Sequence, residues 1–142
     1  MKKYIFLFTL IVGLLSINTR GFGQISVSYD YSSTNRIGLG YNFSKTFWTE
    51  VRVYGNSSFD DLKAELALLF NVIKQDKYIL YIGVSGLPNN GLYLTVPIGI
   101  QFRPIESFKR FSIQIEIQPG MNLQSDVSLF QSSAGIRYTF GD

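Results

Sequence analysis

Hydrophobic and polar residues alternate along most of this chain. In about eight runs, every second position is aliphatic or aromatic, and the positions between are mostly small or polar. A period of two is typical of β-strands with two unlike faces, because successive side chains point to opposite sides of a strand. The runs span residues 25–31, 37–43, 49–53, 62–70, 78–84, 92–102, 111–117 and 134–140. The pattern predicts an all-β fold.

Short connections with turn-forming residues separate the runs, as in Leu87-Pro88-Asn89-Asn90-Gly91. Strands of about ten residues joined in this way predict an eight-stranded antiparallel up-and-down transmembrane β-barrel. Closure would remove the sheet edges that such apolar strands would otherwise expose. We expect the run beginning at Gln24 to pair with the last run. The expected outer loops are 33–35, 55–61, 85–91 and 122–130, and the expected inner turns are 44–46, 72–77 and 104–110.

Two features of the runs are less regular. The stretch DDLKAELALLF contains good helix formers and could be an amphipathic helix. Its apolar residues nevertheless fall on every second position, which favours a strand. Pro97 and Pro119 lie inside predicted strands, where proline cannot donate to the ladder, so we expect a bulge or a strand end at each.

The few charges on the polar faces indicate which side faces inward. A soluble barrel would carry many charged residues on its exterior, whereas here the acids are few and share the polar face with bases. The lumen of an eight-stranded barrel is just wide enough to be filled by side chains, and charges there must be paired. We therefore predict an apolar exterior and a structural ionic network in the lumen, formed by Glu50, Arg52, Lys63, Glu65, Arg103, Glu116 and Arg137.

Aromatic residues concentrate near the ends of the predicted strands, as in an interfacial girdle. The alternative is that strands in general prefer aromatic residues. The residues concerned are Tyr29, Tyr31, Tyr41, Phe43, Phe47, Trp48, Phe70, Tyr78, Phe102, Phe108, Phe111, Tyr138 and Phe140. The alternative to a membrane barrel is a soluble, lipocalin-like barrel that holds an apolar ligand.

The first 23 residues have a different character from the rest. Lys2 and Lys3 precede an apolar stretch that is short for a membrane span, and Gly21-Phe22-Gly23 is a small-x-small pattern. We expect residues 1–23 to be a cleaved signal peptide and residues 24–142 to be the barrel, with a retained membrane anchor as the alternative. Loss of the basic signal leaves a nearly neutral chain, so the charge gives no support for nucleic-acid binding.

The last predicted strand resembles a known assembly signal. Ser133-Ala134-Gly135-Ile136-Arg137-Tyr138-Thr139-Phe140 is similar to the C-terminal β-signal of outer-membrane barrels, which the barrel-assembly machinery reads. The signal positions are Ser133, Gly135, Tyr138 and Phe140. The stretches LTVPIGIQFRP and FSIQIEIQPGMNL also resemble small OmpA/OmpX-like, porin-family-like outer-membrane barrels of the Bacteroidota. The resemblance implies export to the bacterial outer membrane and supplies no catalytic residues.

The residue types of the chain argue against an enzyme. Enzymatic barrels of this size, such as lipid A deacylases and omptin-type proteases, rely on a histidine, and this chain has none. Two-carboxylate chemistry stays open, although Glu50, Glu65 and Glu116 lie beside bases. With neither histidine nor cysteine, and with no calcium-loop spacing after Asp60 and Asp61, we expect no metal and no cofactor.

Two membrane functions remain after these exclusions. One is a structural or envelope role for a barrel with a filled lumen, and the other is surface adhesion through the outer loops. The scarcity of hot-spot residues in the loops favours the structural role. The expected partners are outer-membrane lipids and, during insertion, the barrel-assembly machinery; we expect a monomer that binds no nucleic acid.

Overall fold

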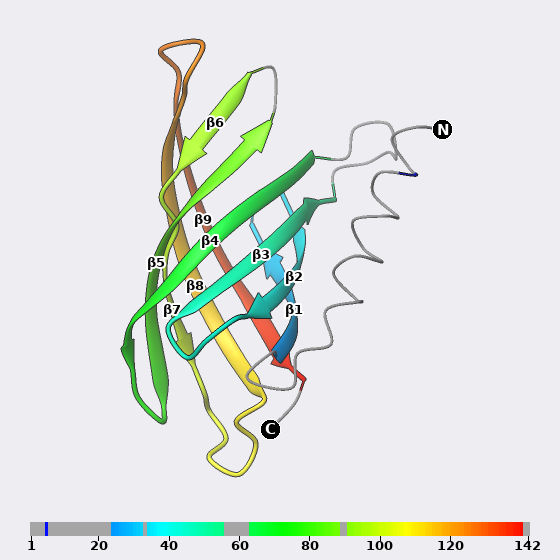
Figure 1. Ribbon diagram of the computed structural model, residues 1–142, viewed down its shortest axis with the longest axis vertical. Coiled ribbons are helices and arrows are strands. Elements are labelled where there is room, and N and C mark those ends of the chain that lie inside the picture. The colour runs from blue at the N-terminus through cyan, green and yellow to red at the C-terminus, as the bar shows by residue number, and fades with distance from the viewer. Residues whose placement is uncertain (1–4, 6–23, 33, 56–62, 89–90, 141–142) are drawn as a thin grey trace.

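The computed structural model describes Ile5 and residues 24–32, 34–55, 63–88 and 91–140. Within these residues the chain forms nine antiparallel β-strands (Figure 1). They are β1 (Gln24–Tyr31), β2 (Arg36–Asn42), β3 (Phe47–Tyr54), β4 (Lys63–Lys74), β5 (Tyr78–Pro88), β6 (Leu92–Thr95), β7 (Ile98–Phe102), β8 (Phe111–Asn122) and β9 (Ser128–Thr139). The predicted signal peptide lies outside the described residues apart from Ile5. No helix in the described ranges is both long and apolar enough to cross a membrane.

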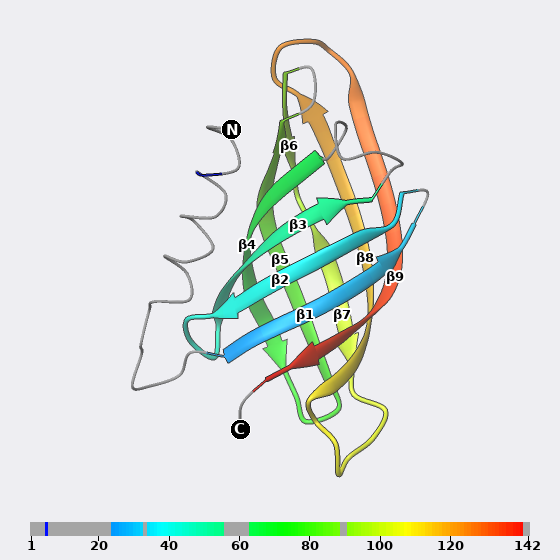
Figure 2. The ribbon, with the colours of Figure 1, turned by 90° about the vertical axis from the view of Figure 1, so that its right-hand side faces the viewer.

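The strands close into a barrel. Strands that are adjacent in sequence pair with each other, except β6 and β7, and β1 pairs with β9, so that Ser26 lies opposite Thr139 and Tyr31 opposite Ala134. Figure 2 shows β1 lying between β2 and β9. The short strands β6 and β7 follow one another between β5 and β8. The nine strands therefore occupy eight positions, and the predicted eight-stranded antiparallel barrel is confirmed.

Two prolines explain the interruption between β6 and β7. Pro97 separates these strands, as predicted, and its carbonyl accepts from the Gly83 N–H at 2.9 Å. The expectation for Pro119 was wrong, because this residue lies within β8, opposite Phe130. Its carbonyl accepts from the Val96 N–H at 2.8 Å, at the same interruption. Both missing N–H donors thus fall at one break in the ladder, and the rest of β8 stays paired.

The wall of the barrel is uneven in height. The described residues 63–70 of the stretch DDLKAELALLF, which could have been a strand or a helix, belong to the strand β4, as their period of two favoured. The expected loops 85–91 and 122–130 are shorter than predicted, because β5 continues to Pro88 and β9 begins at Ser128. These extensions, with β6, form a taller side of the barrel at the end that carries the predicted outer loops (Figures 1 and 2).

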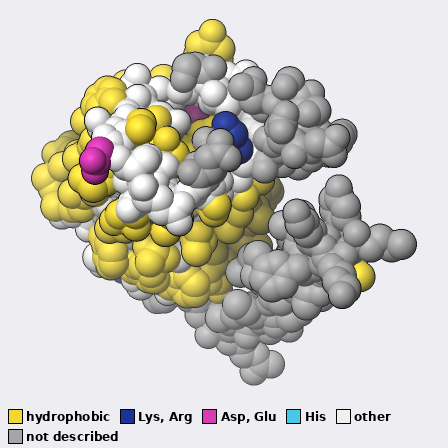
Figure 3. Space-filling view, turned by 90° about the horizontal axis from the view of Figure 1, so that it is seen from above, with side chains coloured by type: hydrophobic (Ala, Val, Ile, Leu, Met, Phe, Trp, Pro, Cys, Tyr) yellow, Lys and Arg dark blue, Asp and Glu magenta, His cyan; other side chains and the backbone are white. Residues whose placement is uncertain are grey.

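The polarity of the barrel is inverted relative to a soluble protein. Along the first half of β8, the exposed positions are isoleucines, with Ile115 56% exposed, whereas its neighbours Gln114 and Glu116 are 0% and 1% exposed. The same alternation runs through β1 and β2. Figure 3 shows hydrophobic side chains over the flanks of the barrel. The prediction of an apolar outer face and a polar inner face is confirmed.

Aromatic side chains form contacts around the inner end of the barrel, defined as the end that carries the predicted inner turns. Phe43 and Phe47 stack at 5.5 Å between ring centroids, and Phe47 lies 5.0 Å from Phe70. On the last strand, Tyr138 lies 4.9 Å from the ring of Phe140. Trp48 was wrongly assigned to this outer girdle. It shares the inward parity of Glu50 and Arg52 and is only 3% exposed.

Candidate functional site: the charged lumen and its inner mouth

The described part of the lumen buries charges from six strands. Alternation in β1, β2, β3, β4, β8 and β9 aims every second side chain inward, and the charged ones lie at similar heights along the barrel. Each of these side chains is at most 3% exposed. They are Asp30, Arg36, Glu50, Arg52, Glu65, Glu116 and Arg137. Because so many buried charges would be costly without partners, their hydrogen bonds decide whether the lumen is stable.

Arg52 lies at the centre of this network and binds three carboxylates. Its Nε donates to Glu50 at 2.6 Å, and its Nη1 donates to Glu65 at 2.9 Å. Nη1 and Nη2 donate to the two oxygens of Glu116, both at 2.8 Å. This two-pronged contact uses the planar shape of the guanidinium group. Arg52 thus joins β3, β4 and β8 across the lumen.

Arg36 extends the network toward the outer end. It donates to Asp30 at 2.8 Å, which closes the β1–β2 hairpin where the two residues are direct register partners. Its other nitrogens donate to Glu116 at 2.8 Å, to Gln118 at 3.0 Å and to Ser133 at 3.0 Å. One arginine therefore connects β1, β2, β8 and β9.

Arg137 extends the network toward the inner end. Its side chain donates to Glu50, to Gln114 at 2.9 Å and to Ser26 at 2.8 Å. Its guanidinium carbon also lies 4.5 Å from the centre of the Trp48 ring, a cation–π contact. Because Arg137 belongs to β9 and its partners to β1, β3 and β8, these bonds cross the seam where the barrel closes.

Neutral donors balance the excess of carboxylates. In the described lumen, three arginines face four carboxylates. Tyr81 donates its hydroxyl to Glu116 at 2.6 Å, and Tyr54 donates to Glu65 at 2.8 Å. Gln118 also donates to Glu65, at 2.9 Å. The carboxylate oxygens that the arginines leave open therefore receive hydrogen bonds from neutral groups, as buried acceptors require.

Five of the seven residues predicted for the network come together in it, and two lie elsewhere. Lys63 and Arg103 share the inward parity, but they lie at opposite rims of the barrel. Lys63 is exposed at the start of β4, and Arg103 follows β7 at the inner mouth. Alternation predicts the face of a residue and not its height along the barrel axis. Asp30 and Arg36 were missed, although their positions across a tight hairpin could have revealed the pair.

The residues of the predicted assembly signal divide between the two faces of β9. Ser133 and Gly135 are on the inward face, and the Ser133 hydroxyl accepts from Arg36. Tyr138 and Phe140 are on the outward side, where their rings are in contact. Just beyond β9, the Phe140 N–H donates to the Ile25 carbonyl at 2.7 Å, which continues the pairing with β1.

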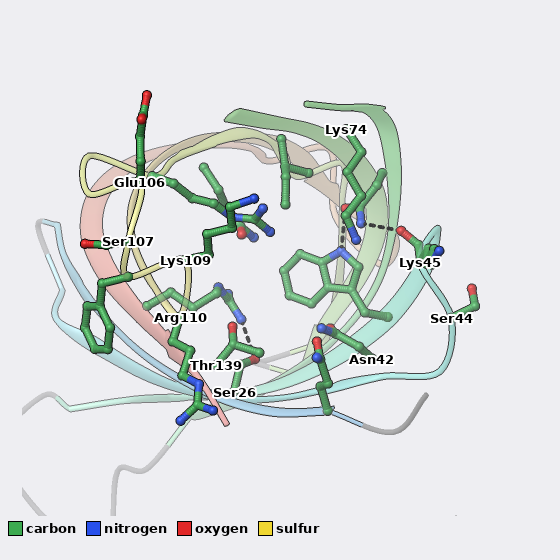
Figure 4. A pocket seen from close by; sticks show the side chains of 18 residues that line it. Ser26, Asn42, Ser44, Lys45, Lys74, Glu106, Ser107, Lys109, Arg110 and Thr139 are labelled. Atoms are coloured by element: carbon green, nitrogen blue, oxygen red, sulfur yellow. Dashed lines mark hydrogen bonds between the residues drawn. The ribbon is translucent and has the colours of Figure 1, made fainter. Parts of the chain in front are cut away.

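A cavity of about 720 Å³ opens at the inner mouth, below the network (Figure 4). Its lining combines the underside of the network with the inner turns. Basic side chains dominate the charged part of this lining: Lys45, Lys74, Arg103, Lys109, Arg110 and Arg137. Glu106 is the one acid among the described residues of the lining, and in Figure 4 it points away from the opening.

The acids of the described lumen are paired with arginines. Arginines hold Glu50, Glu65 and Glu116 in ion pairs, so these carboxylates are engaged rather than available to a substrate. In the described ranges, no group of three or more histidine, cysteine or acidic residues could hold a metal ion. The chemistry that the site supports is hydrogen bonding and charge pairing.

Comparison with known proteins identifies the fold. No protein-family model and no curated protein matches the sequence. Among solved structures, a de novo designed transmembrane β-barrel matches with 14% identity and a TM-score of 0.59, covering 86% of this chain and 98% of that one. The N-terminal β-barrel domain of Pseudomonas aeruginosa OprF matches with 8% identity and a TM-score of 0.56, covering 83% and 96%. Neisserial surface protein A matches with 13% identity and a TM-score of 0.53, covering 83% and 94%. The likeness is one of fold.

Proposed function

We propose that this protein is a non-enzymatic integral barrel of the bacterial outer membrane, with a structural role in the envelope. The inverted polarity of the barrel carries the proposal. Outward-facing Ile115 and Leu66 are 56% and 55% exposed, whereas inward-facing Arg52 is 0% exposed. In water, this arrangement would expose a continuous apolar surface of the kind that soluble monomers avoid. In a lipid bilayer, the same surface would be solvated.

The backbone is also suited to lipid. A bilayer offers no water to unpaired N–H and C=O groups, so a spanning structure must pair them internally. The closed ladder provides this pairing, because β1 is bonded to both β2 and β9. The aromatic contacts between Phe43, Phe47 and Phe70 at the inner end fit a position at the membrane interface.

A structural role agrees with the filled lumen. Residues of β1, β2, β3, β4, β8 and β9 meet across its middle through Arg36, Arg52 and Arg137. A network of this kind leaves little room for solutes and ties opposite walls together. The ion pairs of the lumen acids also support a non-enzymatic role, since a general acid or base must be free to reach its substrate.

Export and assembly complete the proposal. Residues 1–23 would direct the chain out of the cytoplasm and be removed. The barrel-assembly machinery would then recognise the last strand through Ser133, Gly135, Tyr138 and Phe140, and outer-membrane lipids would surround the inserted barrel. The ladder is closed within a single chain, which favours a monomer.

The soluble lipocalin-like alternative fits the described lumen poorly. Such a barrel needs an apolar interior for its ligand. Here the largest fully buried side chains include Arg52, Gln114 and Gln118, and the small apolar cluster of Trp48, Ala67, Leu69 and Tyr81 is packed against the network.

Surface binding is a second candidate, and the taller side of the barrel favours it. This side carries exposed apolar residues near its tip, among them Phe130 at 67% and Leu123 at 55%. Deletion of residues 123–127 tests the two roles against each other. Lost adhesion with an intact envelope would support surface binding, whereas a leaky envelope with unchanged adhesion would support the structural role.

The mobility of unheated protein on a gel tests the main proposal. Protein extracted from isolated outer membranes should run faster before boiling than after it, because a closed barrel stays compact in detergent. It should also require detergent for extraction. A single band, from a protein that is soluble without detergent, would refute the membrane location.

A further inference from the structure

The inner mouth of the barrel contains a cavity that the structural role does not explain. It measures about 720 Å³, a size in the range of small-molecule sites. Its floor includes Ser26, Trp48 and Arg137, and its rim comes from the three inner turns. The pocket is therefore built from segments far apart in the sequence and is held by the paired strands.

Among the described residues that line this cavity, basic side chains outnumber acidic ones. The described lining includes Lys45, Lys74, Arg103, Lys109 and Arg110. In Figure 4, Lys45, Lys74, Lys109 and Arg110 lie around the opening. The Glu106 carboxylate pairs with Lys77 at 3.2 Å, and both groups are largely exposed. Asp76 forms a long, exposed ion pair with Lys109 at 3.4 Å. Neither of these ion pairs involves Lys74 or Arg103.

A β-bulge directs Lys74 into this cavity. The register between β4 and β5 shifts between Asn71 and Ile73, so that Lys74 pairs with the inward-facing Ile79. Without the shift, strict alternation from Leu69 would direct Lys74 to the outer face. The extra residue of the bulge thus places a cation in the mouth of the lumen.

Arg103 reaches the same cavity from the other side of β5. Its backbone N–H donates to the Lys77 carbonyl at 2.7 Å, which fixes it at the rim. Partial burial lowers the pKa of its guanidinium group, and the nearby Asp76 carboxylate opposes this shift. Within the described ranges, neither Lys74 nor Arg103 forms an ion pair. The positive charges of Arg103 and Lys45 repel that of Lys74. An anion bound between Lys74 and Arg103 would be attracted by both and would relieve their mutual repulsion.

We propose that this cavity binds a small, multiply charged phosphate compound through Lys74 and Arg103. Phosphate suits this pair because the arginine fork can contact two oxygens and the lysine ammonium acts as a point charge. A phosphate group could come from a soluble compound or from a lipid headgroup that reaches over the rim. The site requires only the folded barrel and not its location in a membrane. The phosphate proposal can therefore be correct even if the proposed membrane location is wrong.

Titration with pyrophosphate in a phosphate-free maltoside detergent tests the site. Calorimetry should detect saturable binding to the folded protein, and K74Q/R103Q should weaken it at least tenfold. Lys63→Gln is the matched control, since Lys63 is an exposed lysine at the opposite rim of the barrel; it should change the affinity less than twofold. Heat-modifiable mobility checks that each variant is folded.

A second titration, with a short-chain phosphatidic acid below its micelle concentration, distinguishes the two sources. Tighter binding of pyrophosphate supports a soluble ligand, and tighter binding of the lipid supports a headgroup, provided that K74Q/R103Q weakens either one. The proposal is overturned if neither probe binds, if the double variant binds as well as the wild type, or if Lys63→Gln causes an equal loss.

Discussion

At the scale of single residues, Arg52 has the largest share of the charge pairing in the lumen. It is 0% exposed and forms ion pairs with Glu50, Glu65 and Glu116. A buried ion pair adds little net stability when intact, because desolvation offsets the attraction. Removing one partner is different, since the remaining charges stay buried without compensation. The network is therefore most sensitive to changes at its centre.

Replacing Arg52 with Gln should destabilise the barrel by about 3–5 kcal/mol, because three buried carboxylates would each lose their ion pair with this arginine. Urea unfolding in lipid vesicles measures this change through the fluorescence of Trp48, the one tryptophan of the chain. The double variant R52Q/E116Q should lose less than the sum of the two single variants, because it removes one of the uncompensated carboxylates.

Lys63→Gln provides the control for this experiment. Lys63 has the same inward parity as Glu65 but is exposed at the rim, so its loss should change stability by less than about 0.5 kcal/mol. If R52Q and Lys63→Gln proved equally mild, the central role of Arg52 in the lumen would be wrong.

At the scale of elements, the fit between β5 and β7 depends on one glycine. Gly99 is the register partner of Tyr81 and faces the lumen beneath its ring. A Cβ atom at Gly99 would overlap the Tyr81 ring, which is 0% exposed. The same tyrosine donates to Glu116. Gly99 thus allows a strand contact that places a hydrogen bond of the network.

Gly99→Ala should therefore cost about 1–3 kcal/mol by overpacking. Gly86→Ala is the matched control in β5, because the atom nearest to its added Cβ would be Leu92 Cδ1 at an ordinary 3.6 Å. Gly86→Ala should unfold within about 0.5 kcal/mol of the wild type. Equal urea midpoints for the two variants would show that Tyr81 can move away from an added methyl group.

The sequence predicted most strands and their faces, and it predicted the site less completely. A period of two assigns a residue to a face, which was enough to place Glu50, Arg52 and Arg137 inside. It does not report height along the barrel, which is why Lys63 and Arg103 were misplaced. The bulge that redirects Lys74 has no signal in the apolar pattern, since Val72 and Ile73 are both apolar. Trp48 was misassigned because its residue type was given more weight than its parity.

The last strand leads to a prediction about assembly. If Tyr138 and Phe140 are read by the assembly machinery, Y138A/F140A should reduce the amount of barrel in isolated outer membranes several-fold. Ile136→Ala is the control, because Ile136 is 50% exposed on the same face but lies at a variable position of the signal. Quantitative blotting of membrane fractions measures the effect.

Refolding without the machinery separates recognition from stability in this variant. Tyr138 also contacts the Phe108 ring at 5.9 Å, so its loss could weaken the barrel itself. Purified Y138A/F140A should fold into lipid vesicles nearly as completely as the wild type. A folding defect in vesicles as large as the defect in cells would mean that these aromatic residues act through packing and not as a signal.

At the scale of the whole molecule, the exterior and the interior have exchanged their usual polarities. Isoleucine, leucine and valine face outward on every side of the barrel, and glutamate, glutamine and arginine fill its centre. An apolar patch alone could bind a protein partner, and a buried ion pair alone occurs in soluble proteins. Together the two features indicate that the surroundings of the barrel are apolar. In such surroundings the outward-facing apolar side chains avoid water, while the charged side chains are paired inside. The solvent at the exterior can be tested directly.

A charge placed at the middle of the apolar face distinguishes a barrel surrounded by lipid from a barrel surrounded by water. Ile115 lies near the centre of β8 and is 56% exposed, so Ile115→Lys removes few internal contacts. In a bilayer it should cost about 2–4 kcal/mol, because a lysine at mid-depth lies farthest from water. Ile105→Lys, at an exposed position in the inner turn, should cost less than about 1 kcal/mol. Urea unfolding in vesicles compares the two variants. A soluble barrel would tolerate both substitutions equally and would become more soluble with Ile115→Lys, which would place the apolar face in water.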